Sequence, residues 1–208
     1  MVHEDRVRSV GRVVALLVVV LLAAAAPAHA QAPTEVRVMT FNIWLGGDVV
    51  DSGSVIRAIQ GANADIVGLQ EAEGNTRKIA QALGWPYWSD RLHVVSRYPL
   101  IDPPVARGEY VLAQVSPGRV FALANVHLTS DPYGPYLVRD GRSLSRVLAN
   151  ERATRLPEIR HTLRALRPAL RRGIPTFITG DFNTPSHLDW TAARTDHKYP
   201  VDWPVTEA

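Results

Sequence analysis

The stretch Ile174-Pro175-Thr176-Phe177-Ile178-Thr179-Gly180-Asp181-Phe182-Asn183 decides the fold class of this 208-residue chain. It starts as a short apolar run, which is typical of a buried strand, and Gly180 allows the backbone to turn at the end of that run. Asp181 and Asn183 are two positions apart, so their side chains project from one face. A sheet delivers metal- or phosphate-binding groups to its rim in this way, although ordinary turns also contain Gly-Asp. The stretch therefore predicts a functional strand end only if other strands end similarly.

Three runs farther upstream also carry a polar side chain at or near their end. They are Val36-Arg37-Val38-Met39-Thr40-Phe41-Asn42-Ile43-Trp44, Asp65-Ile66-Val67-Gly68-Leu69-Gln70-Glu71 and Phe121-Ala122-Leu123-Ala124-Asn125-Val126-His127-Leu128. Asn125 and His127 share one face of the last run because side chains alternate along a strand. Four strands that end in an amide, a carboxylate, an imidazole and an Asp-x-Asn group can converge on one rim. Hard oxygen ligands with one imidazole are the groups that a Mg²⁺-assisted phosphoester site requires.

In this order, the four strand ends resemble the motifs of the endonuclease/exonuclease/phosphatase superfamily, which has the deoxyribonuclease-I-like fold. The motifs are Thr40-Phe41-Asn42, Leu69-Gln70-Glu71, Asn125-Val126-His127-Leu128 and Gly180-Asp181-Phe182-Asn183. Ser96-Arg97-Tyr98-Pro99 is similar to a segment common in the bacterial members, and the likeness runs from about Val36 to about Asp189. The resemblance implies an α/β fold in which two packed β-sheets are flanked by helices, a four-layer α/β/β/α sandwich.

The resemblance also implies a role for each polar strand end. Glu71 would bind the metal, Mg²⁺ with Mn²⁺ or Ca²⁺ as alternatives, and Asn42 would support that metal. His127 and Asn183 would bind the phosphoryl oxygens, while Asp181 would orient the water that attacks phosphorus in line. A structural role is the alternative for each residue: a surface glutamate, an asparagine that caps a turn, or a core histidine.

The activity that the resemblance implies is metal-dependent hydrolysis of a phosphoester, by a phosphodiesterase, a phosphatase or a nuclease. The substrate can then be a nucleic acid, a phospholipid head group or a small phosphate ester. A pI of about 9.5 first suggests nucleic acid. However, the first 30 residues hold three of the 23 basic and two of the 20 acidic residues, so the remainder carries a net charge of only +2. This nearly balanced charge disfavours non-specific DNA binding, which depends on neutralising phosphates.

The end of the sequence departs from the family pattern. The family closes its site with a further Asp and a terminal Asp-His pair, whose His is the general base, on strands that complete the second sheet. Thr195-Asp196-His197 is similar to that pair, but Asp196 comes only 13 positions after Asn183 and leaves little room for those strands. In secreted relatives, a stretch like Lys198-Tyr199-Pro200-Val201 lies in the loop after Gly-Asp-Phe-Asn.

We therefore expect Asp196 and His197 to be non-catalytic and the second sheet to be incomplete. On this interpretation the 208 residues are a truncated member of the family that hydrolyses little substrate by itself. The alternative function is a non-catalytic secreted module that keeps the fold and lacks the terminal base.

The first 30 residues have the pattern of a secretory signal peptide. Three arginines precede the 14-residue apolar run from Val13 to Ala26, and Ala28-His29-Ala30 resembles a cleavage site. A membrane-spanning helix needs about 20 apolar residues. The sequence therefore predicts cleavage after Ala30, no stable membrane anchor, and a secreted domain over residues 31–208; an uncleaved anchor is the alternative.

Cysteine is absent from the chain, which excludes disulfides, thiolate metal sites and a cysteine nucleophile.

Helices are predicted from Asp51-Ser52 through about Gln60 and over Thr76 to Leu83, the second stopped by Gly84. Ser130 to Gly141 contains two Pro and two Gly and predicts a loop. That loop either faces substrate as a lid or is a plain surface connection.

A longer helix follows this predicted loop. Its expected core-facing stripe consists of Leu156, Ile159, Leu163, Leu166 and Leu170. Pro157 predicts a helix start or a kink within the stripe. A second stripe, which we expect to be a solvated face, consists of Arg160, Arg164, Arg167 and Arg171.

Overall fold

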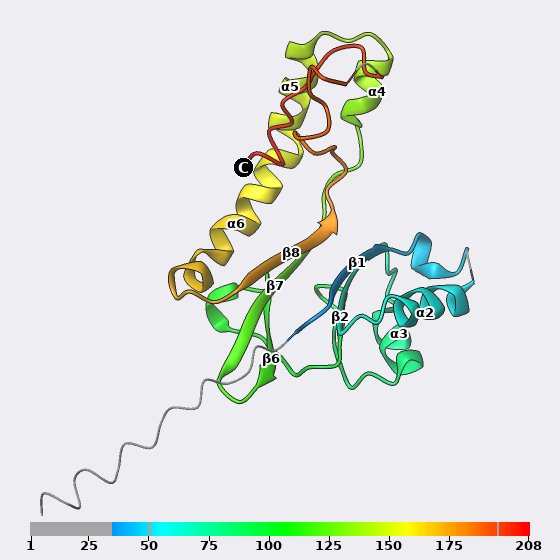
Figure 1. Cartoon of the computed structure of the whole chain (residues 1–208), viewed down its shortest axis with the longest axis vertical. Coiled ribbons are helices and arrows are strands. Elements are labelled where there is room, and N and C mark those ends of the chain that lie inside the picture. Colours follow the sequence, from blue (N-terminus) through cyan, green and yellow to red (C-terminus); the bar gives the residue numbers. More distant parts are fainter. Residues whose placement is uncertain (1–34, 50, 195) are drawn as a thin grey trace, which may run out of the picture. The chain divides into compact units, whose positions relative to one another are not determined.

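Two four-stranded mixed sheets flanked by helices make up the part of the protein that a computed structural model describes, residues 35–49, 51–194 and 196–208 (Figure 1). The first sheet has the order β1-β2-β4-β3, with β1 (Val38–Asn42), β2 (Ile66–Gln70), β3 (Tyr87–Ser89) and β4 (Val94–Ser96). The second has the order β5-β6-β7-β8, with β5 (Leu100–Ile101), β6 (Val111–Ser116), β7 (Arg119–His127) and β8 (Thr176–Asp181). These sheets confirm the predicted α/β sandwich. The predicted signal peptide, residues 1–30, lies outside the described residues.

One parallel strand pair in each sheet leads to the polar strand ends. In the first sheet, β1 pairs with β2, and Asn42 lies opposite Gln70. In the second, β7 pairs with β8, and His127 lies opposite Asp181. Because the carboxyl ends of parallel strands meet at one edge, each sheet presents two neighbouring polar ends.

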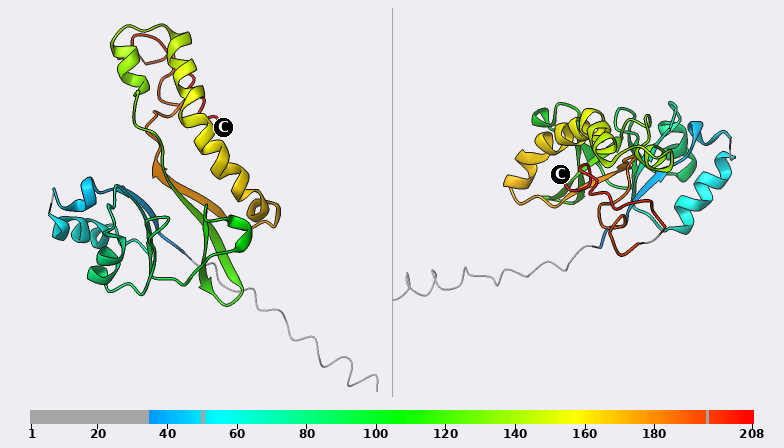
Figure 2. Two further views of the ribbon diagram at one scale, coloured as in Figure 1. Left: turned by 180° about the vertical axis from the view of Figure 1, so that it is seen from behind. Right: turned by 90° about the horizontal axis from the view of Figure 1, so that it is seen from above.

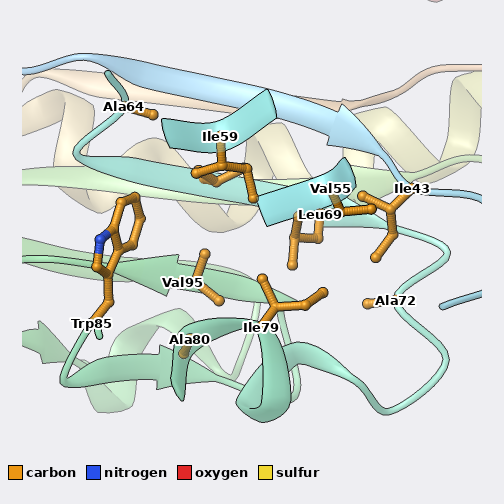
Figure 3. Packing of buried hydrophobic residues seen from close by; sticks show 11 residues of the cluster. Ile43, Val55, Ile59, Ala64, Leu69, Ala72, Ile79, Ala80, Trp85 and Val95 are labelled. Atoms are coloured by element: carbon orange, nitrogen blue, oxygen red, sulfur yellow. The ribbon is translucent and has the colours of Figure 1, made fainter. Parts of the chain in front are cut away.

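The outer face of the first sheet is covered by α2 (Ser52–Gly61) and α3 (Thr76–Leu83), while η1 (Leu45–Gly47) follows β1. The Asp51 carboxylate caps α2 by accepting hydrogen bonds from the backbone N–H groups of the first turn. Gly84 ends α3 in the left-handed conformation (φ 69°). Both helices therefore begin and end as the sequence predicts. Figure 3 shows Ile59 of α2 and Ile79 of α3 pointing towards strand residues Leu69 and Val95 in one buried cluster.

The second sheet is covered by η2 (Pro104–Ala106) and α6 (Arg155–Arg171), while α4 (Gly134–Arg139) packs on α5 (Leu144–Ala153) and α5 packs on α6. The long helix α6 runs along β7 and β8, and Leu166 and Ala169 pack on Ala122 and Ala124 (Figure 1 and Figure 2). Pro157 lies in its first turn, as predicted, because a first-turn residue needs no intrahelical N–H bond.

The arginine stripe of α6 is exposed, as predicted. The prediction of the core-facing apolar stripe is wrong for its last residue, because Leu170 is 52% exposed. Ala169 takes the core-facing position in the last turn instead.

The prediction of an uninterrupted loop over Ser130 to Gly141 is wrong, because it contains α4. Proline is tolerated in the first helical turn, so the Gly-Pro pair that indicates a loop here starts a helix. Val138 of α4 packs with Val147 of α5 and with Trp203. Burial of this apolar side chain stabilises a six-residue helix that local propensity alone does not favour.

A buried ion pair fixes the segment between β7 and α4. Arg155 Nη1 lies 2.8 Å from Glu151 Oε1, and both side chains are fully buried. The same guanidinium donates hydrogen bonds to the carbonyl oxygens of Ser130 and Pro132. Burial raises the pKa of the Glu151 carboxyl, while the neighbouring Arg155 charge acts in the opposite direction. The pair therefore holds the chain just beyond His127 in place.

No strand follows β8 within residues 182–194 and 196–208. Val201 and Trp203 are buried against α4 and α5, and Lys198 Nζ donates a hydrogen bond to the carbonyl oxygen of Arg139. This agrees with the prediction that Lys198 to Val201 belong to a loop. Among the described residues, no helix has the length and apolar character that crossing a membrane requires.

The two sheets face each other through a polar network close to the strand ends. Asn125 Oδ1 accepts hydrogen bonds from Gln70 Nε2 (2.7 Å) and Thr179 Oγ1 (2.9 Å). Asn125 Nδ2 donates to the carbonyl oxygens of Leu69 and Leu92. These polar groups satisfy one another by hydrogen bonds although they lie between the sheets. The hydrogen bonds therefore fix how β2 of the first sheet packs on β7 and β8 of the second.

Gly68 allows this close approach of the sheets, and its replacement by alanine is expected to destabilise the protein. A Cβ atom at position 68 would overlap Thr179 Oγ1 and Asn125 Oδ1. Overpacking of this kind costs about 1–3 kcal/mol, and the broken network adds to the loss. The matched control is Gly61→Ala, because a Cβ at position 61 of α2 meets no other atom within 4 Å. Urea unfolding of both variants checks the prediction, and equal stabilities would contradict it.

Candidate active site

Side chains from both sheets meet at the strand ends around a single amide. Asn42 Nδ2, at the end of β1, donates hydrogen bonds to Glu71 Oε1 (2.8 Å) and to Asp181 Oδ2 (3.0 Å). His127 Nε2 lies 4.0 Å from the same Asp181 oxygen. The backbone N–H of Asn183 donates to Asp181 Oδ1 (3.0 Å). Short contacts therefore connect all five predicted site residues at the strand ends, although Asn42, Asp181 and Asn183 do not line the cleft that Glu71 and His127 share.

Glu71 is held in a defined orientation by the segment that follows β1. Its Oε2 atom accepts a hydrogen bond from the backbone N–H of Leu45 (3.2 Å), and its carbonyl oxygen accepts one from Gly46 (2.7 Å). Asn42 Oδ1 accepts from the backbone N–H of Trp44, which leaves the Asn42 amide nitrogen facing the carboxylates. Glu71 thus sits on a preorganised rim.

Strained backbone gathers around this rim. Non-glycine residues with positive φ rarely occur without a compensating reason. The positive-φ residues at the rim are Trp44, Leu45, Glu71, Glu73, His93 and Asn183. Such strain is typical of sites where side-chain placement matters more than local stability.

His127 and Asp181 stay accessible, with side chains 38% and 33% exposed. Asn183 Nδ2 donates one hydrogen bond to the carbonyl oxygen of Leu128 (2.9 Å). An amide nitrogen carries two hydrogens, so the second remains available to a bound oxygen. His127 and Asp181 are placed by their strands, Asn183 is held by its hydrogen bond to Leu128, and each side chain keeps a group that can bind a ligand.

Glu71 and His127 line a cleft of about 490 Å³. The cleft is also lined by Gln70, Glu73, Arg91, His93 and Asn125. A second hollow, of about 470 Å³, lies on another side of His127 and is lined by Glu109, Glu158 and His161 among others. His127 thus borders both cavities.

Sequence reasoning missed His93 and Arg91, because neither lies at the end of an apolar run. Tyr133 was also missed, and no motif marks it. Burial, assisted by the nearby Asp181 carboxylate, raises the pKa of the Tyr133 phenol.

The donor set at the rim fits a hard divalent cation. Glu71 and Asp181 both accept from one Asn42 nitrogen, so two carboxylates are held close together, and a cation would offset their repulsion. Mg²⁺ usually binds through one or two protein carboxylates, with water and substrate oxygens completing its coordination. In the described part of the chain, no three histidine or acidic side chains form a group able to hold a metal. A site that relies on substrate and water for its remaining ligands is consistent with this arrangement.

Asp196 and His197 do not line the cleft. A hydrogen bond from Arg194 is the main cause that lowers the pKa of Asp196 to about 2. The His197 ring stacks on Trp190 at a centroid distance of 3.8 Å. Both residues thus have structural partners of their own.

Replacing His197 with alanine is expected to change kcat/KM less than about twofold, because the ring contributes packing alone. The lost stacking on Trp190 should lower the free energy of unfolding by about 0.5–1.5 kcal/mol. Steady-state kinetics and urea unfolding of the variant check both parts. A large loss of activity in a folded variant would make His197 part of the site.

Comparison with known proteins relates the chain to a described family. The sequence profile of the Endonuclease/Exonuclease/phosphatase family matches residues 39–203, a range that includes all five site residues. An uncharacterized protein of Caenorhabditis elegans is 31% identical over 195 residues, which cover 83% of this chain. The chain spans 62% of the length of that relative. No solved structure matches the chain.

Proposed function

The chain belongs to the endonuclease/exonuclease/phosphatase family, and we propose that it is a hydrolase that cleaves a phosphoester with a divalent metal ion bound at Glu71. The family is generally hydrolytic, acts on phosphoesters such as nucleic acids, and typically uses divalent metal ions. The proposal adds the site residues, the metal position and the mechanism to that general activity.

The observation that carries the proposal is the Asn42 amide that bridges Glu71 and Asp181. One nitrogen within 3.0 Å of both carboxylates ties a residue of the first sheet to one of the second. If these residues only stabilised the fold, an amide and two carboxylates would not need to meet at an accessible rim. An accessible histidine and an amide with a free hydrogen beside the two carboxylates complete a set suited to phosphoryl chemistry.

In the proposed mechanism, each residue has one task. Glu71, oriented by Asn42 and Leu45 N–H, would hold Mg²⁺, which supplies positive charge to the phosphoryl group. Asp181 accepts a hydrogen bond from the attacking water and orients it in line with the leaving oxygen. His127 and the free hydrogen of Asn183 Nδ2 bind phosphoryl oxygens whose charge increases in the transition state.

Hydrolysis of a substrate panel tests the proposal. The panel contains a nucleic acid, a phospholipid with a phosphodiester head group and small phosphate mono- and diesters, each assayed with Mg²⁺ and with EDTA. We expect weak Mg²⁺-dependent product release from at least one class, abolished by EDTA, in line with the low activity expected of these 208 residues. Absence of turnover from every class, in a protein with a cooperative unfolding transition, would favour a non-catalytic secreted module.

We further propose that the protein is secreted after cleavage behind Ala30. The support is the short apolar run of residues 13–26 followed by small residues. Expressed in a secreting bacterial host, the protein should appear outside the cytoplasmic membrane with Gln31 as its first residue. N-terminal sequencing that finds Val13 to Ala26 in the exported protein would instead identify an anchor.

A further inference from the structure

His93 lines the same cleft as Glu71 and His127, although it belongs to no motif. It directly precedes β4, which pairs with β2 in the first sheet. Its backbone has a φ of 51°, and its carbonyl oxygen accepts a hydrogen bond from the N–H of Leu69 (2.8 Å). The fold thus holds a strained residue beside Glu71, and strain of this kind marks positions where side-chain direction matters.

The imidazole of His93 is anchored through one ring nitrogen. Its Nδ1 atom lies 2.9 Å from the hydroxyl of Thr76, a fully buried residue at the start of α3. Within the described residues, Nε2 has no hydrogen-bond partner. When the Thr76 hydroxyl donates to Nδ1, the neutral ring carries its proton on Nε2 and offers it as a donor. The anchor is compatible with this tautomer, in which Nε2 can donate to a ligand in the cleft.

The position of His93 relative to Asp181 indicates which ligand atom it serves. Asp181 ends β8 in the second sheet, whereas Glu71 directly follows β2 and His93 directly precedes β4, two strands of the first sheet. In-line displacement places the attacking water and the leaving oxygen on opposite sides of phosphorus. If Asp181 orients the water from the second sheet, the leaving oxygen departs towards the wall that the first sheet provides.

We propose that His93 is a catalytic residue that donates a hydrogen bond from Nε2 to the leaving oxygen of the phosphoester, an inference that rests on the hydrolase function proposed above. The bond strengthens as negative charge develops on that oxygen while its bond to phosphorus breaks. The attacking water releases its proton to solvent and the leaving oxygen takes one from solvent water, so His93 keeps its own proton. Other side chains of this wall are less suited. Arg91 is occupied by Asp102 and by the carbonyl oxygen of Gly108, and the charge of Glu73 would repel a leaving alkoxide.

Dependence on the leaving group separates this role from a structural one. His93→Ala and His93→Gln are assayed with Mg²⁺ on two diesters of one phosphate, with 4-nitrophenolate or an alkoxide as leaving group. The loss of one transition-state donor costs roughly 10²–10³-fold in rate. We expect His93→Ala to lose rate by this factor with the strongly basic alkoxide as leaving group. With the weakly basic nitrophenolate, which needs little stabilisation, the fold-loss in rate should be less than about a tenth as large. Glutamine, whose side-chain amide also donates, should restore part of the alkoxide rate.

Two further variants complete the design. Thr76→Val keeps the shape of the side chain and removes the anchor, so it should shift the leaving-group dependence in the same direction by a smaller factor. His161→Ala, outside this cleft, is the matched control and should leave the ratio of the two rates unchanged. Thermal unfolding of each variant establishes that it is folded.

The outcomes distinguish the two proposals. Equal losses for both leaving groups in His93→Ala, with the wild type active, would overturn the role of His93 and leave the hydrolase function intact. A wild type that hydrolyses neither diester nor any panel substrate would overturn both. If His93→Ala does not fold, a leaving-group dependence in Thr76→Val that equals the wild type would overturn the role of His93.

Discussion

Replacing Glu71 with glutamine is expected to lower kcat/KM for phosphoester hydrolysis roughly 10³-fold, because metal-ion charge stabilisation is worth several kcal/mol and each 1.36 kcal/mol is tenfold in rate. Glutamine keeps an oxygen that can accept from Asn42 Nδ2, so the rim should stay assembled. What disappears is the negative charge that attracts the cation. The Mg²⁺ concentration for half-maximal activity should therefore rise together with the loss in rate.

The matched control for this variant is Glu73→Gln. Glu73 lies two residues away, lines the same cleft and also has a positive φ, but its carboxylate forms no hydrogen bond or ion pair with another described residue. The same loss of charge at position 73 should not lower kcat/KM and should leave the Mg²⁺ dependence unchanged, because this carboxylate holds no metal in the proposal and its charge disfavours the leaving alkoxide. Mg²⁺ titrations of both variants measure the difference. Equal Mg²⁺ dependence in the wild type and in Glu71→Gln would remove Glu71 from the metal site.

The rim was predictable from sequence because its groups follow directly from strand ends. A strand fixes the direction of each side chain by alternation, and parallel pairing fixes which ends meet. These two rules place Asn42 opposite Gln70, next to Glu71, and His127 opposite Asp181. The left-handed backbone that orients Glu71 does not follow from them. The hydrogen bond from Asn42 to Asp181 joins the two sheets, so it also requires the sheets to face each other. That packing of the sheets was predicted only from the resemblance to a known fold.

Other features depended on contacts that no local pattern records. His93 reaches the cleft through a left-handed backbone and a partner 17 positions away, Thr76. The helix α4 forms because Val138 is buried by residues far along the chain. Leu170 is exposed because Ala169 occupies the core-facing position at that turn. In each case tertiary packing overrides the local signal.

The site also shows why Asn42 is best regarded as an organiser of the two carboxylates. Its oxygen is used by the backbone N–H of Trp44, and its nitrogen is shared between Glu71 and Asp181. A metal bound at Glu71 would therefore be supported by Asn42 through hydrogen bonds that orient the ligand. Such supporting partners typically affect metal affinity or activity 10–100-fold when mutated.

Replacing Asp181 with asparagine is expected to lower kcat about 10²–10⁴-fold, the usual contribution of a side chain that accepts a proton or hydrogen bond from the nucleophile. The amide oxygen can still accept from the backbone N–H of Asn183, so the turn after β8 should persist. The Mg²⁺ requirement should change less than in Glu71→Gln, because the ligand that holds the metal remains. This contrast between the two carboxylates assigns one to the metal and the other to the water.

Asp196→Asn is the matched control for Asp181→Asn, because it makes the same chemical change at an exposed carboxylate that pairs with Arg194. Its kcat should remain within about twofold of the wild type, as for surface substitutions away from a site. Single-turnover rates at saturating Mg²⁺ measure the chemical step in each variant and exclude effects on product release. If Asp196→Asn lost as much rate as Asp181→Asn, both carboxylates would be needed for the chemical step. If Asp181→Asn kept the wild-type single-turnover rate, the attacking water would have to be oriented by another group, and the placement of the leaving oxygen beside His93 would lose its basis.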